Sequence, residues 1–446
     1  MIYPLNFEQK IGFDHVRQLL KGKCLSPLGI EKVEDMDFSG DFNIINCRLD
    51  QVVEFMRILQ EEDDFPCQYF FDVRPSLRRI KVEGMYMDEQ ELFDLRRSLE
   101  TIRDIIRFLQ QTDDEGEEDN DSFPYPALSE LAGDIMTFPQ LITRINNILD
   151  KFGKMKDNAS AELLRIRREL SATTGSISRS LNSILRSAQS DGYVDKDVTP
   201  TMRDGRLVIP VAAGMNRKIR SIVHDESATG KTVFIEPAEV VEANNRIREL
   251  EGEERREIIR ILTEFSAVVR PQVPAILSSY EFLAEIDFIR AKAVFSIEAK
   301  ACKPDVEDRQ IVDWFEAVHP LLQMSLAKHG KKVVPLDIEL TPEKRILLIS
   351  GPNAGGKSVC LKTVGLLQYM LQCGVPVPMH ERSHVGIFES IFIDIGDEQS
   401  IEDDLSTYSS HLTNMKNMMK GCNGRSLILI DEFGGGTEPQ IGGAIA

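Results

Sequence analysis

An apolar run followed by a glycine-rich segment constrains the fold of this chain more than any other feature. Residues 351–358 read Gly-Pro-Asn-Ala-Gly-Gly-Lys-Ser, directly after the apolar run at 345–350. This spacing, G-x-x-x-x-G-K-[ST], is the P-loop pattern when a buried strand precedes it and a helix follows. The glycines let successive backbone N–H groups turn inward around a phosphate. The predicted nucleotide-binding residues are Gly351, Pro352, Asn353, Ala354, Gly355, Gly356, Lys357 and Ser358.

A second motif lies about 75 residues further along the chain. Residues 425–432 read Arg-Ser-Leu-Ile-Leu-Ile-Asp-Glu, an apolar strand that ends in two carboxylates. Each motif alone could be purely structural. The first could be a glycine-rich turn, and the second could be a strand with an exposed acidic end. Together they favour a site for ATP and Mg²⁺. In that site Ser358 and Asp431 hold the ion, Lys357 contacts the phosphates and Glu432 polarises the attacking water. We therefore predict Lys357 and Glu432 as catalytic residues.

A polar stretch before the second motif indicates the class of P-loop protein. Residues 395–411 are rich in hydroxyl and acidic side chains, among them Ser406, and a helical pattern follows. Hydroxyls at a helix N-terminus either cap their own helix or hold a phosphate that another subunit presents, and both readings stay open here. Together with the tandem carboxylates, this stretch is typical of the ABC type of ATPase.

The segment from about residue 345 to residue 446 closely resembles the ATPase domain of the MutS family, and more narrowly its second bacterial subfamily. Members of that subfamily usually end in an Smr nuclease domain. The matching strings are the P-loop, Asp-Ile-Gly-Asp-Glu-Gln-Ser-Ile at 394–401, Leu-Ser-Thr-Tyr-Ser-Ser-His at 405–411 and Ile-Asp-Glu-Phe-Gly-Gly-Gly-Thr-Glu-Pro-Gln at 430–440. Shorter strings at 204–210, 222–228 and 234–237 are also similar to that subfamily.

The resemblance implies a function and an assembly. It implies a homodimer in which Ser406 of one subunit, with Asn353 of the P-loop, reaches a nucleotide across the interface. Nucleotide state and grip on DNA would then be linked. It further implies action on branched or structured DNA in recombination suppression and repair, and contact with ribosomes or rRNA.

Helical patterns occupy most of the chain before the P-loop. Apolar residues recur at helical spacing over 7–23, 42–62 and 88–111, which is typical of bundle helices. Heptad spacing over 158–189 and a second long helix over 240–301 predict an antiparallel coiled-coil arm. We expect Pro271 and Pro274 to break or kink the second helix.

The segment between the two long helices reads as a small antiparallel sheet. Its apolar runs lie at 207–211, 219–223 and 232–235, with turns at Gly214 and Gly230. We therefore predict an α plus α/β fold in three parts. These are a helical core or lever region over 1–130, the arm over 131–300 with a β-rich clamp tip at about 195–240, and an ABC-type P-loop ATPase over 301–446.

The predicted tip is locally basic. Its candidate nucleic-acid contacts are Arg206, Arg217, Lys218, Arg220 and Lys231. On residues alone, a solvated hairpin and a phosphate-binding surface are equally good readings, and the resemblance to a clamp favours DNA. No aromatic residues alternate with the basic ones, so contact with a duplex backbone is favoured over base stacking. The net charge of −19 argues against indiscriminate coating of nucleic acid.

Other features exclude several classes. No run of 18 apolar residues predicts a membrane span, and the N-terminus lacks the pattern of a secretion signal. The seven cysteines contain no C-x-x-C pair, and the histidines lack the spacing of a zinc site. We therefore expect a cytoplasmic protein without disulfides, membrane contact or zinc.

Three expected elements of longer family members do not occur in this sequence. There is no mismatch-reading domain with a Phe-x-Glu element, no strands beyond the second motif and no Smr domain. We therefore expect this chain to be part of a longer protein, to bind ATP weakly or not at all by itself, and to hydrolyse it poorly. Two alternatives remain: a binding and dimerisation module without catalysis, and another coiled-coil ABC ATPase, of the chromosome-condensing or double-strand-break type.

Overall fold

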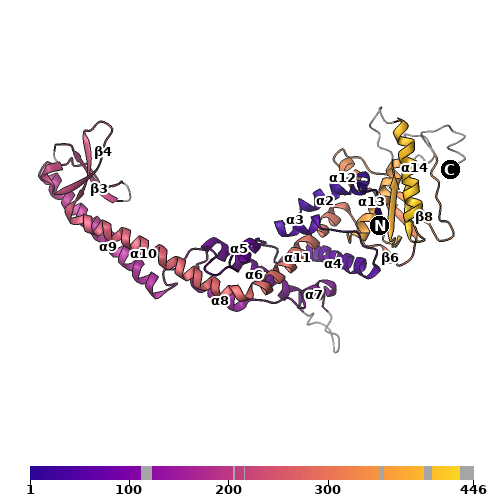
Figure 1. Cartoon of the computed structure of the whole chain (residues 1–446), viewed down its shortest axis with the longest axis horizontal. Coiled ribbons are helices and arrows are strands. Elements are labelled where there is room, and N and C mark those ends of the chain that lie inside the picture. Colours follow the sequence, from indigo (N-terminus) through magenta and orange to yellow (C-terminus); the bar gives the residue numbers. More distant parts are fainter. Residues whose placement is uncertain (112–122, 204–205, 215, 352–355, 396–403, 432–446) are drawn as a thin grey trace. The chain divides into compact units, whose positions relative to one another are not determined.

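The computed structural model describes residues 1–111, 123–203, 206–214, 216–351, 356–395 and 404–431 (Figure 1). The chain divides into two compact units. Unit 1 contains Met1–Asp72, Glu100–Thr137 and Ile276–Ala446, and unit 2 contains Val73–Leu99 and Phe138–Ala275. The three-part division expected from the sequence stays a prediction.

Unit 1 combines helices with two small sheets. Its helices are α1 (Phe7–Ile11), α2 (Phe13–Lys21), α3 (Pro27–Glu34), α4 (Phe42–Glu61), α7 (Pro126–Ala132), α12 (Pro320–Ala327), α13 (Lys357–Gln372) and α14 (Asp404–Gly421), together with the end of α6 (Glu89–Leu109) and most of α11 (Val273–Ala299). The helix predicted over 7–23 is interrupted, because Gly12 has a φ of +80° and ends α1 in the left-handed region. The helices predicted over 42–62 and 88–111 are confirmed as α4 and α6 (Glu89–Leu109).

The first sheet of unit 1 is parallel and has the order β1-β10-β11. Its strands are β1 (Ile2–Tyr3), β10 (Ser390–Asp394) and β11 (Ser426–Ile430), and Asp394 is in register with Ile430. The carboxyl ends of β10 and β11 therefore lie together, at the start of the tandem-carboxylate motif. The strand predicted over 425–430 is thus confirmed as β11.

The strand predicted before the P-loop is not observed. Residues 345–350 form no ladder with any strand in the described part of the chain, and Ile346 and Leu348 are 92% and 86% exposed. The expectation of a buried strand there is wrong for this structure. A strand is stable only when a neighbouring strand pairs with its backbone N–H and C=O groups, and residues 345–350 have no such neighbour among the described residues.

The second sheet of unit 1 has the order β6-β9-β7-β8. The strands are β6 (Asp305–Glu307), β9 (His384–Gly386), β7 (Val312–Ala317) and β8 (Leu336–Leu340). The β6–β9 pair is parallel, and the other two pairs are antiparallel. One face of this sheet joins the main core of unit 1 through Val306, Val385, Val312 and Trp314.

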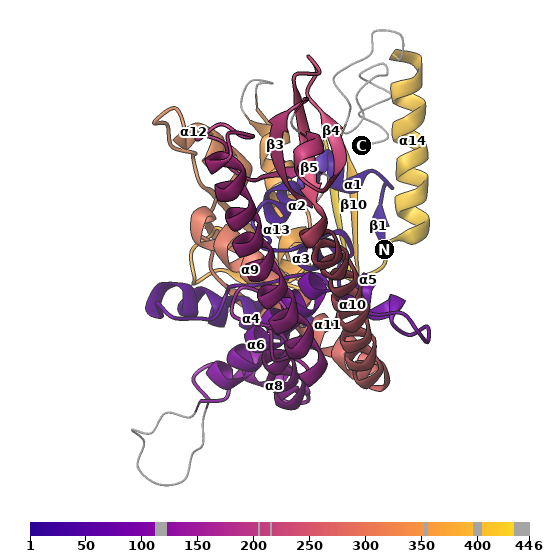
Figure 2. The same cartoon turned by 90° about the vertical axis from the view of Figure 1, so that its left-hand side faces the viewer.

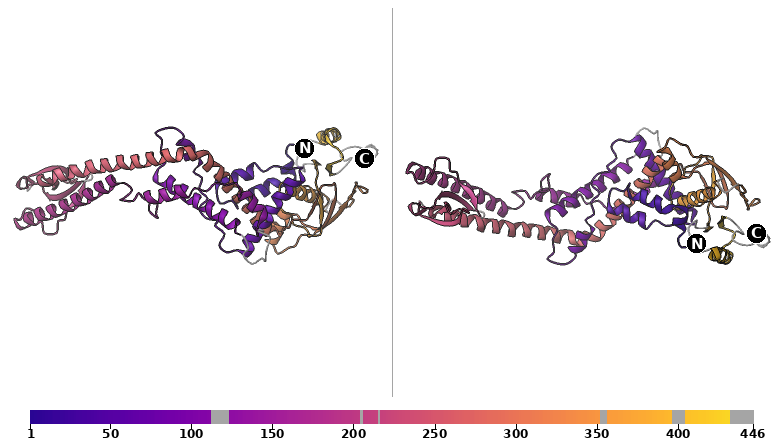
Figure 3. Two further views of the ribbon diagram at one scale, coloured as in Figure 1. Left: turned by 90° about the horizontal axis from the view of Figure 1, so that it is seen from below. Right: turned by 90° about the horizontal axis from the view of Figure 1, so that it is seen from above.

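Unit 2 contains two long helices that run side by side (Figures 1 and 3). They are α9 (Ala161–Ser190) and α10 (Ala238–Val269). They are antiparallel, because Arg165 pairs with Glu253 at 3.3 Å while Glu169, one turn further on, pairs with Arg246 at 2.8 Å. The remaining helices of unit 2 are α5 (Arg74–Arg79), α8 (Pro139–Ile148), and the short 3₁₀ helices η1 (Asn216–Lys218) and η2 (Arg270–Gln272).

The proline break predicted in the second long helix is confirmed. Helix α10 ends at Val269, η2 contains Pro271, and α11 (Val273–Ala299) continues the chain.

The predicted heptad seam is only partly buried. No residue between 167 and 176 of α9 is buried, and the helices are joined there by ion pairs. Part of α6 and the start of α11 complete unit 2. Among the described residues, no helix is both long and apolar enough to cross a bilayer.

The small antiparallel sheet predicted between the long helices is confirmed, and Figure 2 shows its labelled strands beside one another. The order is β2-β3-β5-β4, and the strands are β2 (Thr201–Arg203), β3 (Arg206–Ala212), β5 (Thr232–Pro237) and β4 (Ser221–Glu226). The sequence did not predict β2. The inner face of the sheet packs on the helix pair through Ile209, Val233 and Ile235, against Leu181 and Val240.

Candidate nucleotide site and basic sheet

The glycine-rich segment leads directly into α13. Gly356 caps this helix with a φ of +84°, which a side chain would oppose, and the helix begins at Lys357. The Lys357 ammonium donates a hydrogen bond to the Gly351 carbonyl oxygen at 2.7 Å. Ser358 is half-buried in the first turn, where the unpaired N–H groups of a helix attract anions. Pro352, Asn353, Ala354 and Gly355 lie outside the described residues.

Helix α13 is fixed by burial of its second half. Every residue from Thr363 to Gln372 is buried. Gly365 faces β11 and β10, and a Cβ added there would lie 3.1 Å from Leu429 and 3.7 Å from Ile393. The helix that follows the glycine-rich segment therefore packs directly on the strand that leads to Asp431. In its first turn, burial raises the pKa of the Cys360 thiol, which disfavours a thiolate beside a phosphate.

Asp431 lies at the carboxyl end of β11, as predicted. It is 9% exposed, and its N–H donates to the Asp394 carbonyl oxygen at 2.8 Å across the sheet. A carboxylate is a ligand of the kind that a hard divalent cation prefers. Glu432, the predicted catalytic carboxylate, lies outside the described residues.

A polar network that the sequence reading missed surrounds Asp394. The Asp394 carboxylate lies 2.6 Å from His411 Nδ1 and accepts a hydrogen bond from Asn414 Nδ2 at 2.8 Å. Asn414 Oδ1 in turn accepts from the Tyr3 hydroxyl at 2.7 Å, and Asn417 donates to that hydroxyl at 2.9 Å. One feature of the sequence could have indicated Asp394. An apolar run that ends in an acidic residue occurs twice, at 390–394 and at 426–431.

The network attaches α14 to the end of β10. Asp394 is 3% exposed, so its charge requires the partners that α14 supplies. Ser406, the residue predicted to reach a nucleotide in another subunit, lies in the first turn of this same helix. The structure thus ties the backbone of Asp431, through Asp394, to the helix that carries Ser406.

Unit 2 presents the basic residues in two different ways. Arg206 donates to both oxygens of Glu236, at 2.8 and 3.0 Å, and to Asn245 at 2.8 Å. Glu236 is fully buried, so this arginine is held as the partner of a buried charge. The predicted contacts Arg217, Lys218, Arg220 and Lys231 are exposed, the first two on η1.

One further basic residue belongs with the exposed group. Arg203, at the end of β2, is exposed and stacks over the Phe234 ring at 4.3 Å, with Asp225 at 3.8 Å. The charge of Arg203 contributes to the basic character of this segment of the sequence, but Arg203 was not among the predicted nucleic-acid contacts. It adds a further exposed cation to this sheet.

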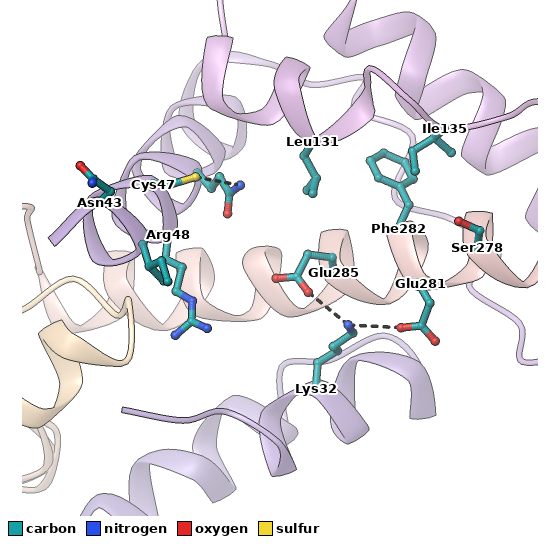
Figure 4. Close-up of a pocket in the computed structure, with 12 residues that line it drawn as sticks. Lys32, Asn43, Cys47, Arg48, Leu131, Ile135, Ser278, Glu281, Phe282 and Glu285 are labelled. Carbon is teal, nitrogen blue, oxygen red and sulfur yellow. Dashed lines mark hydrogen bonds and ion pairs between the residues drawn. The ribbon is translucent and has the colours of Figure 1, made fainter. Parts of the chain in front are cut away.

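A separate pocket in unit 1 lies between α3, α4, α7 and α11 (Figure 4). Lys32 lies 3.2 Å from Glu281 and 3.4 Å from Glu285. Burial lowers the pKa of Lys32, but the two carboxylates outweigh burial and hold it above its usual value. Arg48 of the lining pairs with Asp37 outside it at 3.3 Å, and no glycine-rich loop is among the lining residues, so we do not assign the pocket to the nucleotide.

Comparison with known proteins agrees with the resemblance read from the sequence. The family model of MutS domain V matches residues 347–446. Proteins named endonuclease MutS2 are 38% identical over 97% of this chain in Geobacillus sp. (strain WCH70) and 37% identical over 98% in Caldanaerobacter subterraneus. A further one, from Alkaliphilus oremlandii, is 38% identical over 97% of this chain. The chain spans about half the length of these relatives, 53 to 54%. It belongs to the MutS family, in the group of the MutS2 proteins.

Proposed function

We propose that this chain is the part of a DNA-binding ATPase that binds ATP and contacts nucleic acid. The observation that carries the proposal is the packing of α13 on β11, which brings the helix that begins with Lys357 and Ser358 against the strand that ends before Asp431. A triphosphate needs a cationic helix N-terminus, and its metal ion needs a carboxylate beside it. Both are offered by elements in direct contact.

Each residue has a proposed role in ATP binding and hydrolysis. The backbone of residues 351–356 and the Lys357 ammonium bind the phosphates, so Lys357 exchanges its bond to Gly351 for one to phosphate. Ser358 and Asp431 fit a Mg²⁺ ion, because one is a hydroxyl in the first helical turn and the other a largely buried carboxylate. Bound Mg²⁺ neutralises phosphate charge. Glu432 orients the attacking water.

We further propose that the site is shared between two copies of the chain. Ser406 would contact the nucleotide of the partner, and the Asp394–His411 contact would hold α14 in the orientation that this requires. His411 and Asp394 would then act as positioning residues. Closure of the dimer on ATP would be linked to the exposed cations of the β2–β5 sheet, which would contact the backbone of branched or structured DNA.

Nucleotide binding tests the first part of the proposal. We expect the full-length protein to bind a fluorescent ATP analogue in the presence of Mg²⁺, and Lys357→Ala to weaken that binding at least tenfold. Glu432→Ala should keep binding and lower turnover in the full-length protein, since it removes the proposed base and no phosphate contact. Equal binding by the full-length Lys357→Ala variant would rule out the proposed phosphate site.

Substrate choice needs the full-length protein. Affinity for a four-way DNA junction should exceed affinity for a linear duplex of the same length and should change with the bound nucleotide. If ribosomes were bound in a nucleotide-dependent way and junctions were not, rRNA would replace DNA as the ligand of the basic sheet. If neither Lys357→Ala nor Glu432→Ala altered turnover, the chain would be a binding and dimerisation module.

A further inference from the structure

A second group of potential metal ligands lies on the sheet β6-β9-β7-β8. The parallel register of β6 and β9 places Asp305 opposite His384, and Glu307 lies two residues further on the same face. His384 Nδ1 is 3.1 Å from Asp305 Oδ2 and 2.8 Å from Glu307 Oε1. One ligand atom from each of the three side chains lies within 4.8 Å of the other two.

The backbone that carries these ligands is tightly constrained. At Gly386, a Cβ would lie 2.1 Å from the Arg309 carbonyl oxygen, so only glycine permits the β6–β7 turn to pass there. The Gly386 N–H donates to the Ile311 carbonyl oxygen at 2.8 Å. On the other face, Val306 and Val385 are buried in the core of unit 1. The two strands therefore hold the ligands at a fixed spacing, as metal binding requires.

The imidazole nitrogen lies between the two carboxylates. His384 Nδ1 has no contact with solvent, although the side chain as a whole is 40% exposed, and its contacts with Asp305 and Glu307 have the distances of ion pairs. In the neutral tautomer with its proton on Nε2, the Nδ1 lone pair faces both carboxylates, and a cation that all three groups coordinate would take the place of the ion pairs.

Neighbouring charges make the site suited to a cation. Asp313 on β7 is in register with His384, and Glu339 on β8 is in register with Asp313, so further carboxylates share this face. Two of these carboxylates already have cationic partners, since Arg309 pairs with Glu307 and Lys344 lies 3.4 Å from Glu339.

We propose that Asp305, Glu307 and His384 form a binding site for a divalent transition-metal ion of the Mn²⁺ or Zn²⁺ type. One imidazole and two carboxylates suit such ions, whereas Ca²⁺ and Mg²⁺ prefer oxygen ligands alone. The ion joins β6 to β9, two three-residue strands that are distant in the sequence, and so stabilises the sheet.

This site is distinct from the proposed Mg²⁺ site. Asp308, next to Glu307, pairs with Arg425, which immediately precedes β11. Asp431 follows the other end of that strand, and five residues of strand span roughly 17 Å. The inference therefore does not depend on nucleotide binding.

Titration with Mn²⁺ in the absence of nucleotide tests the site, because Mn²⁺ binds carboxylate and imidazole ligands but has little affinity for the seven cysteines. We expect one ion per chain by electron paramagnetic resonance, and at least tenfold weaker binding in Glu307→Gln and His384→Gln. Arg309→Gln should bind more tightly, because the competing guanidinium is gone. His329→Gln, which changes an exposed histidine elsewhere in unit 1, is the matched control.

Thermal unfolding supplies a second measurement that also reports folding. Mn²⁺ should raise the Tm of the wild-type chain and of His329→Gln but not that of His384→Gln, since an ion stabilises only the state that binds it. Binding that His384→Gln leaves unchanged but Asp431→Asn removes would assign the ion to the nucleotide site and overturn the proposal. No binding by folded wild-type chain would show that His384 is only an ion-pair partner of the two carboxylates.

Discussion

Single buried polar residues decide much of the local chemistry in unit 1. Asp394 is enclosed and depends on His411 and Asn414, and it adjoins the backbone of Asp431. Removing one partner of such a group leaves a buried charge unsatisfied, at a cost of roughly 3–5 kcal/mol. The same residues therefore affect folding and site geometry together.

Lys292 is a buried charge with a measurable pH signature. It is 2% exposed, donates to the Cys373 carbonyl oxygen at 3.1 Å and lies over the Phe288 ring at 4.0 Å. Complete burial lowers its pKa from 10.5 to about 8. The unfolded chain therefore binds more protons between pH 8 and 10.5, and this lysine makes the folded state more stable as pH rises through that window.

We therefore expect Lys292→Met to gain stability relative to wild type at pH 7, and this gain to disappear by about pH 10.5. The difference should approach roughly 3 kcal/mol, from about 1.4 kcal/mol per pKa unit. Denaturant unfolding at a series of pH values measures it as a difference between the two proteins, in which other titrating groups largely cancel. Lys331→Met, at an exposed position, should show no such trend. A constant difference across the pH range would contradict the low pKa.

At the scale of elements, the contact between α13 and β11 depends on a glycine. Gly365 permits it, because a Cβ there would lie 3.0 Å from Ile11 and 3.1 Å from Leu429. We expect Gly365→Ala to reduce the free energy of unfolding by about 1–3 kcal/mol, because packed side chains must move. It should also weaken binding of an ATP analogue, since the start of α13 would shift relative to β11.

The chain offers a matched control for this substitution. Gly175 lies inside α9 with nothing within 4 Å of an added Cβ. Gly175→Ala should therefore raise stability by up to about 1 kcal/mol through helix propensity. Calorimetric unfolding of both variants separates the two effects. Equal stability changes in the two would show that α13 does not depend on close contact with β11.

Much of the element pattern was predictable because it depends on local periodicity. The long helices, the proline break and three strands of the small sheet follow from apolar spacing and from turn residues. The failures have tertiary causes. Residues 345–350 have the composition of a strand but no partner among the described strands, and the heptad pattern could not show that α9 and α10 meet through ion pairs near Glu169.

The candidate sites were predictable to different extents. Lys357 and Ser358 could be located from a local motif, because the loop and helix that present them are continuous in sequence. The ligand group of Asp305, Glu307 and His384 could not, because strand pairing brings together residues about 80 positions apart. Spacing along the chain predicted no metal-binding histidine for the same reason. Arg206 also has a role, as the partner of Glu236, that charge alone did not indicate.

At the scale of the whole molecule, net charge and local charge oppose each other. The chain carries a net charge of −19, so nucleic acid should be bound only where cations are concentrated and not already paired. Arg217, Lys218 and Lys231 of the β2–β5 sheet are exposed and fall within residues 217–231. Arg206 is held by Glu236 and should contribute less to phosphate contact than to the fold of the sheet.

We therefore expect the combined change of Arg217, Lys218 and Lys231 to Gln to weaken binding of a branched duplex strongly and to reduce its salt dependence. Each lost phosphate contact lowers the slope of log K against log salt concentration by about 0.9, so the slope should fall by between two and three. The control changes three exposed lysines of unit 1 to Gln, Lys328, Lys331 and Lys332, which alters the net charge equally. Fluorescence anisotropy at a series of salt concentrations measures both. If the two triple variants lost affinity to the same extent, net charge rather than the basic sheet would govern binding, and the sheet would have no special role in holding DNA.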